Sequence, residues 1–178
     1  PLFRSRAASR AAVSDHVGDP LPHDVPERLR DPFGHVMIDA SGMLMAATGE
    51  RPTAVGDQFV VHMDREALND YPLGLYDVTV EITTFVPDEE IAWMTRGLIE
   101  PPIGHVYGYR IEPIEGGSLV TSYYDWSNVR EEYREGIFPI IPESALRATL
   151  GVLARTVAPG QPRPGADSPG FGALRSDG

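Results

Sequence analysis

The sequence contains no cysteine and no lysine in its 178 residues. Without cysteine there is no disulfide, no thiol nucleophile and no thiolate metal ligand. Without lysine there is no Schiff-base amine and no phosphate-binding lysine of a P-loop. No segment reaches the roughly 18 consecutive apolar residues of a membrane-spanning helix, so we expect no membrane span. A chain without disulfides suits a reducing compartment, and we expect a cytoplasmic location.

Positive charge is also scarce in the central part of the chain. All fifteen basic residues are arginine, and 26 acidic residues bring the net charge to −11. Residues 31–157 hold twenty acidic and only eight basic side chains. Because a surface this acidic repels a phosphate backbone, we expect no nucleic-acid partner.

Common catalytic and metal-binding motifs are missing as well. The five histidines show no HExxH or comparable ligand spacing, so we expect no metal site and no cofactor. The Gly-x-Ser-x-Gly sequence of a nucleophile elbow is absent. A hydrolase with a serine nucleophile or a zinc-activated water is therefore not predicted.

The two ends of the chain differ from the part between them. Residues 1–24 place arginines among alanines and serines, without the apolar core of a secretory signal, and we interpret them as a poorly ordered leader. Residues 158–178 contain four prolines and five glycines without apolar periodicity, which is typical of a disordered tail; a docking peptide is the alternative. Residues 25–157 then form one domain.

Alternating apolar and polar residues predict six strands between residues 43 and 126. Turn sequences such as Pro87-Asp88 and Glu115-Gly116-Gly117 join neighbouring strands as hairpins, which favours an antiparallel sheet. The predicted strands cover residues 43–47, 56–64, 75–86, 90–96, 104–113 and 118–126.

Helical signals lie on either side of these strands. A short helix is expected over residues 25–30, broken by Asp31-Pro32-Phe33-Gly34, with a second helical turn over 35–38. Residues 130–135 are rich in charge and are expected to form a loop. A stripe of apolar residues then predicts one long helix that ends at Pro159-Gly160; its members are Leu146, Leu150, Leu153 and Val157. The expected fold class is α+β, a curved antiparallel sheet of about six strands wrapped around a long C-terminal helix.

Several short segments, in this order and at this spacing, resemble one known superfamily. They are Asp31-Pro32-Phe33-Gly34-His35, Ile38-Asp39-Ala40-Ser41-Gly42, Val55-Gly56-Asp57-Gln58-Phe59, Glu90-Ile91-Ala92-Trp93, Tyr109-Arg110-Ile111-Glu112-Pro113, and Gly116-Gly117-Ser118-Leu119-Val120-Thr121 running to Asp125-Trp126-Ser127. The chain resembles the START-like (SRPBCC) superfamily over residues 25–157, and particularly its actinobacterial members of the polyketide cyclase/dehydrase-like kind. The resemblance implies a helix-grip fold with a ligand pocket of roughly several hundred Å³ between sheet and terminal helix.

One feature of that superfamily has no clear counterpart here. Its members begin with a strand before the first helix, whereas residues 1–24 offer only Ala11-Ala12-Val13 as a trace of one. Prolines after residue 18 cannot donate to a β-ladder, so we expect residues 14–24 to run as irregular chain. The sheet is then expected to lack its first strand, and an open edge of this kind suits a homodimer.

The inward face of the predicted sheet supplies the candidate ligand-binding residues. They are Phe59, Val61, Trp93, Tyr109, Ser122, Tyr124 and Trp126, with Leu146, Leu150 and Leu153 on the opposing helix. A plain hydrophobic core is the alternative explanation for the aromatic residues. Asp39 is a further polar candidate.

His105 and Tyr107 are the candidate catalytic residues, because both share the inward parity of that face and histidine titrates near neutral pH. The alternative for His105 is a hydrogen-bonded structural role. Three functions follow, in this order. The first is binding of a small hydrophobic molecule, such as a lipid or a polyketide-like aromatic. The second is a polyketide cyclase or dehydratase that moves protons with a pocket histidine and tyrosine. The third is protein interaction through the open sheet edge.

Overall fold

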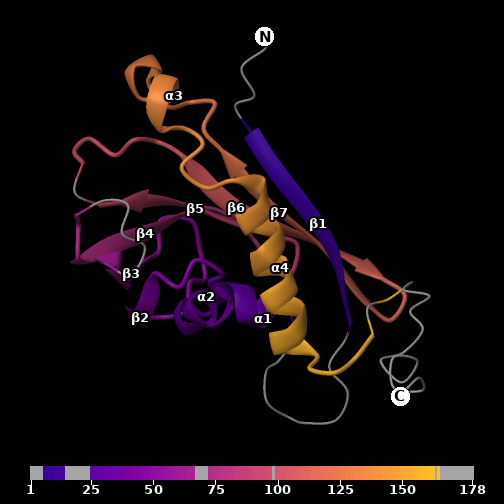
Figure 1. Ribbon diagram of the computed structural model, residues 1–178. Helices are drawn as coiled ribbons and strands as arrows, with labels where there is room; N and C mark the ends of the chain where they lie inside the picture. The colour runs from indigo at the N-terminus through magenta and orange to yellow at the C-terminus, as the bar shows by residue number, and fades with distance from the viewer. Residues whose placement is uncertain (1–5, 15–24, 67–71, 98, 163, 165–178) are drawn as a thin grey trace, which may run out of the picture.

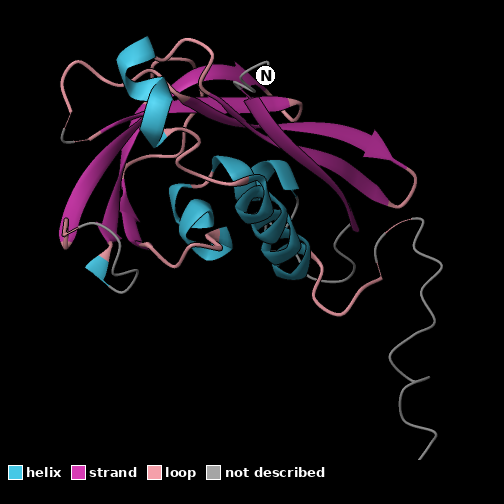
Figure 2. Ribbon diagram, turned by 45° about the horizontal axis from the view of Figure 1, so that its top comes forward, coloured by secondary structure: helices cyan, strands magenta, loops and turns pink. Residues whose placement is uncertain are grey.

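One antiparallel sheet of seven strands, in the order β1-β7-β6-β5-β4-β3-β2, curves around the helices α1, α2 and α4 (Figures 1 and 2). It is seen in a computed structural model that describes residues 6–14, 25–66, 72–97, 99–162 and 164. The curvature leaves a concave face toward α4 and a convex face on the outside (Figure 2). The predicted α+β class and the predicted wrapping of sheet around the terminal helix are confirmed.

All six predicted strands are present, and their ends lie within two residues of the predicted positions. The strands are β2 (Leu44–Thr48), β3 (Gln58–Asp64), β4 (Leu75–Val86), β5 (Glu90–Arg96), β6 (Val106–Ile114) and β7 (Gly117–Asp125). Antiparallel pairing joins each to its neighbour in sequence. The alternation of large apolar and polar side chains was therefore a sufficient signal for these strands.

The expectation of a missing first strand is wrong, because β1 (Arg6–Ser14) occupies that position. It pairs with β7 along its whole length, from Arg6 opposite Asp125 to Ser14 opposite Gly117. Its inward residues are small, and they pack beneath α4 where larger side chains would not fit. Residues 6–14 are thus a paired strand and not a loose leader, while the rest of the predicted irregular segment, 15–24, lies outside the described residues.

Two short helices connect β1 to the rest of the sheet, α1 (Val25–Arg30) and α2 (Pro32–Ile38). The expectation that Asp31-Pro32-Phe33-Gly34 breaks the helical segment is correct only for α1, because the same residues begin α2. The Asp31 carboxylate accepts a hydrogen bond of 3.0 Å from the Phe33 N–H, and proline follows it in the first turn. Both are preferred residues at a helix N-terminus.

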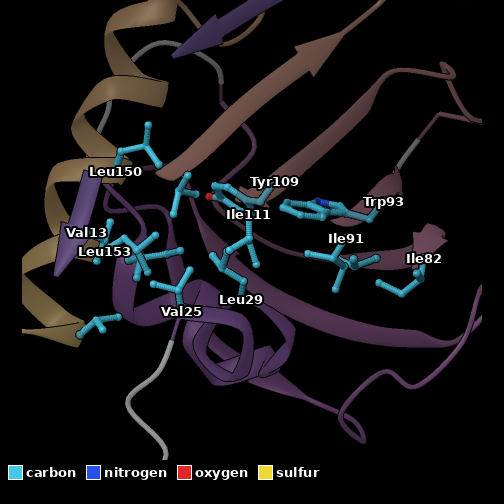
Figure 3. Packing of buried hydrophobic residues seen from close by; sticks show 14 of the residues in the cluster. Val13, Val25, Leu29, Ile82, Ile91, Trp93, Tyr109, Ile111, Leu150 and Leu153 are labelled. Carbon is cyan, nitrogen blue, oxygen red and sulfur yellow. The ribbon is translucent and has the colours of Figure 1, made fainter. Parts of the chain in front are cut away.

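Two further helices follow the sheet. The charged segment expected to be a loop instead contains α3 (Glu131–Ile137). The long predicted helix is confirmed as α4 (Glu143–Val157), and its four stripe residues are all buried. Figure 3 shows Leu150 and Leu153 of α4 facing Val13 of β1 and the concave side of the sheet.

The buried side chains form two neighbouring clusters. The larger one joins α1, α2 and α4 to the middle of the sheet and includes Phe59, Leu150 and Leu153. The smaller one lies toward the end of the sheet near α3 and includes Tyr124, Trp126 and Phe138. The cavity described below lies beside both clusters, because its walls take residues from each.

Candidate functional site

A cavity of about 280 Å³ lies between the concave face of the sheet and the helices α2 and α4. Its walls come from α2 and the following loop (His35, Ile38, Asp39, Ser41, Met43), from β2–β4 and Arg65 (Leu44, Val61, Met63, Arg65, Tyr76, Val78, Val80), from β5–β7 (Trp93, Thr95, Tyr107, Gly108, Tyr109, Ser122, Tyr123), and from residues 140–149 (Ile140, Ile141, Ala145, Leu146, Thr149). Most of these side chains are apolar or aromatic, and the polar ones are few. That composition is typical of small-molecule pockets.

Only part of the predicted set of binding residues lines this cavity. The cavity-lining members are Val61, Trp93, Tyr109, Ser122 and Leu146, together with Tyr107 from the predicted catalytic pair. The others, Phe59, Tyr124, Trp126, Leu150 and Leu153, are also buried but belong to the packed clusters. These five side chains lie in the hydrophobic core outside the cavity, and a role for them in binding stays a prediction.

Trp93, Tyr107 and Tyr109 form an aromatic wall of the cavity. The Trp93 ring centroid lies 6.2 Å from that of Tyr107 and 5.6 Å from that of Tyr109. Burial raises the pKa of the Tyr109 phenol, although a hydrogen bond with Ser122 acts in the opposite direction. The hydroxyl therefore stays neutral at physiological pH, and it supplies a polar atom in an otherwise apolar wall.

His105 faces inward as predicted, but it lies behind the cavity wall. Its Nδ1 hydrogen-bonds with the Tyr124 hydroxyl at 2.8 Å, and its Nε2 with Thr95 Oγ1 at 3.0 Å. The Tyr124 hydroxyl also bonds with the Tyr107 hydroxyl and with the backbone of Ile140. Tyr107 and Thr95 line the cavity, whereas His105 and Tyr124 do not.

The protonation states of this network are shifted away from neutral pH. Burial lowers the pKa of His105 to about 4, and burial raises the pKa values of Tyr107 and Tyr124 above that of free tyrosine. Near pH 7 the imidazole is neutral and both phenols are protonated. Both imidazole nitrogens have partners, and the network connects His105 with the cavity-lining residues Thr95 and, through Tyr124, Tyr107.

His35 is a cavity-lining residue that the sequence analysis did not select. It belongs to α2, is 8% exposed, and packs against Phe59 and Trp93 with ring-centroid distances of 5.3 and 4.7 Å. Burial is the main cause that lowers its pKa to about 4, so the ring is neutral near pH 7. A helix of two turns is too short for its apolar periodicity to show which residues face inward. The sequence offered only one signal for His35, its position in the first turns after Asp31-Pro32.

Asp39, the further polar candidate, lines the cavity and forms hydrogen bonds within the turn that follows α2. The Asp39 carboxylate accepts hydrogen bonds from the Ser41 N–H at 2.9 Å, the Ser41 hydroxyl at 2.6 Å and the Leu44 N–H at 3.0 Å. It thereby fixes the connection between α2 and β2. Its main role is to hold this part of the cavity rim in place.

No metal or membrane feature is found in the part of the chain that the structure describes. Its histidine and acidic side chains do not gather in any group of three or more that could hold a metal ion. Within the same residues, no helix is long and apolar enough to cross a bilayer.

Comparison with known proteins gives matches only at the level of structure. No protein-family profile and no curated protein matches the sequence. The Aha1 dimer from Colwellia psychrerythraea matches with 16% identity and a TM-score of 0.56, over 85% of this chain and 95% of that one. A major latex-like protein from Panax ginseng matches with 14% identity and a TM-score of 0.52, over 85% and 93%.

A third match is DynU16, a protein of the dynemicin biosynthetic locus, with 14% identity and a TM-score of 0.52. It covers 85% of this chain and 46% of that one. Identities this low show a shared fold and leave the ligand open. The seven-stranded sheet curved around α4 and these matches together show that the chain has the helix-grip fold that the sequence resemblance implied.

Proposed function

We propose that the protein binds one small, mostly apolar molecule in the cavity between the sheet and α4. The observation that carries this proposal is the cavity itself, about 280 Å³ of space beside two hydrophobic clusters. The apolar side chains that line it lack the contacts that a filled core would give them. Occupation by a ligand would restore those contacts.

The size and walls of the cavity indicate the class of ligand. Its volume lies near the lower end of the range of about 300–1,000 Å³ that is common for small-molecule pockets. Trp93, Tyr107 and Tyr109 present flat aromatic surfaces to it. A compact ring compound, such as a polyketide-like aromatic, suits these walls better than a long lipid chain.

Our proposal does not include catalysis by His105. The imidazole is separated from the cavity by Thr95 and Tyr107, and both of its nitrogens are in hydrogen bonds. A base with a pKa of about 4 is a weak proton acceptor at neutral pH. The polyketide cyclase or dehydratase reaction therefore stays a prediction from the sequence resemblance.

Two alanines of α4 allow a matched test of the binding proposal. Ala145 lines the cavity, whereas Ala148, one turn further along, is exposed and does not. We expect Ala145→Phe to fill part of the cavity and to abolish binding of 2-naphthol measured by calorimetry. Ala148→Phe adds the same side chain outside the cavity and should leave the affinity unchanged.

Native mass spectrometry of the purified protein provides an independent measurement. A bound small molecule retained by the wild type and lost from Ala145→Phe would support the proposal. Equal binding of 2-naphthol by wild type and Ala145→Phe, with both variants folded by circular dichroism, would show that the molecule binds elsewhere and would contradict it.

A further inference from the structure

The His35 ring has one nitrogen with a partner and one without. The hydrogen bond with the backbone of Leu29 acts to raise the pKa of His35. This is the effect of a ring N–H that donates to a carbonyl oxygen. Nε2 has no hydrogen-bond partner and almost no exposed surface. The bonded nitrogen is therefore Nδ1, and Nε2 carries an unused lone pair in the neutral ring.

The surroundings explain why protein groups leave this lone pair unsatisfied. Nδ1 is turned back toward α1, which holds Leu29, so Nε2 lies on the other side of the ring. The rings of Phe59 and Trp93 pack against His35, and no described protein group forms a hydrogen bond with Nε2. A buried acceptor without a donor is costly, and most native proteins avoid it.

The position of α2 makes this arrangement rigid. A Cβ atom placed on Gly34 would lie 2.0 Å from the Arg28 carbonyl oxygen, so α2 packs directly against the backbone of α1. The residue after Gly34 is thereby held with its ring in the cavity wall. His35 cannot easily turn away to find a partner elsewhere.

We propose that His35 Nε2 accepts a hydrogen bond from a hydroxyl group of the bound molecule, so that the site selects hydroxylated ring compounds over their ethers and hydrocarbons. This inference rests on the proposed binding function. The ligand hydroxyl supplies the donor that no described protein group offers to Nε2, and the rest of the ligand fills the apolar space. Because Nε2 has almost no exposed surface, binding in this way requires a side chain packed beside His35 to move and admit the hydroxyl.

A pair of probes that differ only in the donor tests the inference on the unchanged protein. 2-Naphthol can donate a hydrogen bond, whereas 2-methoxynaphthalene has nearly the same ring surface and cannot. We expect calorimetry to show that the wild type binds 2-naphthol about tenfold more tightly, the effect of one buried hydrogen bond. The Nε2 resonance of His35 in a protein labelled with ¹⁵N-histidine should move with 2-naphthol and not with the ether.

Variants separate the role of Nε2 from general effects on the cavity. His35→Phe retains a ring but has no acceptor, and it should bind both probes with equal affinity. His35→Gln retains an acceptor and should recover part of the preference. Thr83→Val is the matched control, because Thr83 also has a buried oxygen without a partner but does not line the cavity; it should keep the wild-type preference.

The possible failures are distinguishable. If the wild type binds both probes with equal affinity, the assignment of His35 is overturned while the binding function stands. If the wild type binds neither probe, the proposed binding function fails, and the inference about His35 fails with it. A preference that persists in a folded His35→Phe protein would place the hydrogen-bond acceptor on another residue and would overturn the assignment.

Discussion

Two histidines in the interior connect the site with the stability of the fold. His35 and His105 are 8% and 6% exposed, and burial lowers the pKa of each from 6.5 to about 4. A neutral imidazole suits these places, whereas an imidazolium would lose its hydration on burial. Both histidines therefore have a lower pKa in the folded chain than in the unfolded chain.

The free energy of unfolding should consequently fall as the pH is lowered from about 6.5 to about 4. In that window the unfolded chain binds protons at His35 and His105 that the folded chain does not, so this contribution is complete above pH 6.5 and is lost toward pH 4. Each pKa unit corresponds to about 1.4 kcal/mol. Urea melts at closely spaced pH values measure the slope.

Variants of the two histidines provide the control for this pH dependence. His105→Gln and His35→Gln should each reduce the slope between pH 6.5 and 5, whatever their effect on stability at pH 7.5. The carboxyl groups of Asp57, Glu81 and Glu90 have lowered pKa values, so their contribution is lost at lower pH than this interval. An unchanged slope in both variants would show that the histidines are not the source.

Leu150 and Leu153 are the most completely buried residues of α4. Leu150 is fully buried at mid-helix and faces the sheet beside Leu153 (Figure 3). We expect Leu150→Ala to reduce the free energy of unfolding by about 2–5 kcal/mol, because it leaves a space in a packed cluster. Arg155→Ala, at an exposed position of the same helix, should change it by less than about 0.5 kcal/mol in the same urea melts.

At the scale of elements, a close contact between Gly108 of β6 and Tyr123 of β7 holds these two strands together. The Tyr123 ring lies over Gly108, so that a Cβ atom at Gly108 would be 2.4 Å from its Cζ. The Tyr123 hydroxyl donates a hydrogen bond of 2.8 Å to Glu90, and the guanidinium groups of Arg6 and Arg110 lie over its ring. This contact ties four strands together, since Arg6 belongs to β1 and Glu90 to β5.

Gly108→Ala should therefore destabilise the protein by about 1–3 kcal/mol, because the Tyr123 ring has to move and loses its contacts with the two guanidinium groups. A double-mutant cycle with Tyr123→Ala tests this cause. In the Tyr123→Ala background the added methyl group meets no ring, and the cost of Gly108→Ala should nearly vanish. Equal costs in both backgrounds would show that the glycine is needed for another reason.

How much of these elements the sequence could predict depended on side-chain size and element length. Strands β2–β7 were predictable because large apolar residues alternate with polar ones. β1 was not, because alanine and serine occupy most of its inward positions and such residues give almost no hydrophobic signal. The short helix α3 was mistaken for a loop because its charged residues conceal any apolar face.

The site was only partly predictable for a different reason. Strand parity correctly placed Phe59, Val61 and Tyr109 on the inward face of the sheet. It does not show which inward residues contact the cavity and which pack in the core. Whether an inward residue touches the cavity or the packed core depends on where α2 and α4 lie across the sheet. The positions of these helices relative to the sheet are a property of the whole fold, and the local sequence pattern does not contain them.

At the scale of the whole molecule, the sheet is open, and β1 and β2 are its two edges. β1 covers β7 and contacts α4, so it closes the core on that side (Figure 1). The reason first given for a homodimer, an uncovered β7 edge, is therefore removed. A homodimer formed through an open sheet edge stays a prediction.

Removal of β1 should therefore prevent correct folding. A chain that begins at residue 15 loses every β1–β7 backbone pair and uncovers the side chains beneath α4. We expect size-exclusion chromatography with light scattering to show aggregates, and thermal melts to lose their cooperative transition. A chain that ends at residue 164 is the control, since the sequence predicts a disordered tail beyond it. A monomeric, cooperatively folding chain without β1 would contradict this view.

The pairing of β1 with β7 also constrains the order in which the strands of the sheet can pair during synthesis. Ser9 lies opposite Ser122, so β1 can meet its partner only after more than a hundred further residues have been synthesised. The hairpins from β3 to β7 join residues that are near in sequence and can form earlier, whereas closing so long a loop is slow. The nascent chain must therefore keep β1 unpaired until the rest of the sheet exists. Its small side chains and two arginines suit this interval, because an unpaired strand of that composition has little tendency to aggregate.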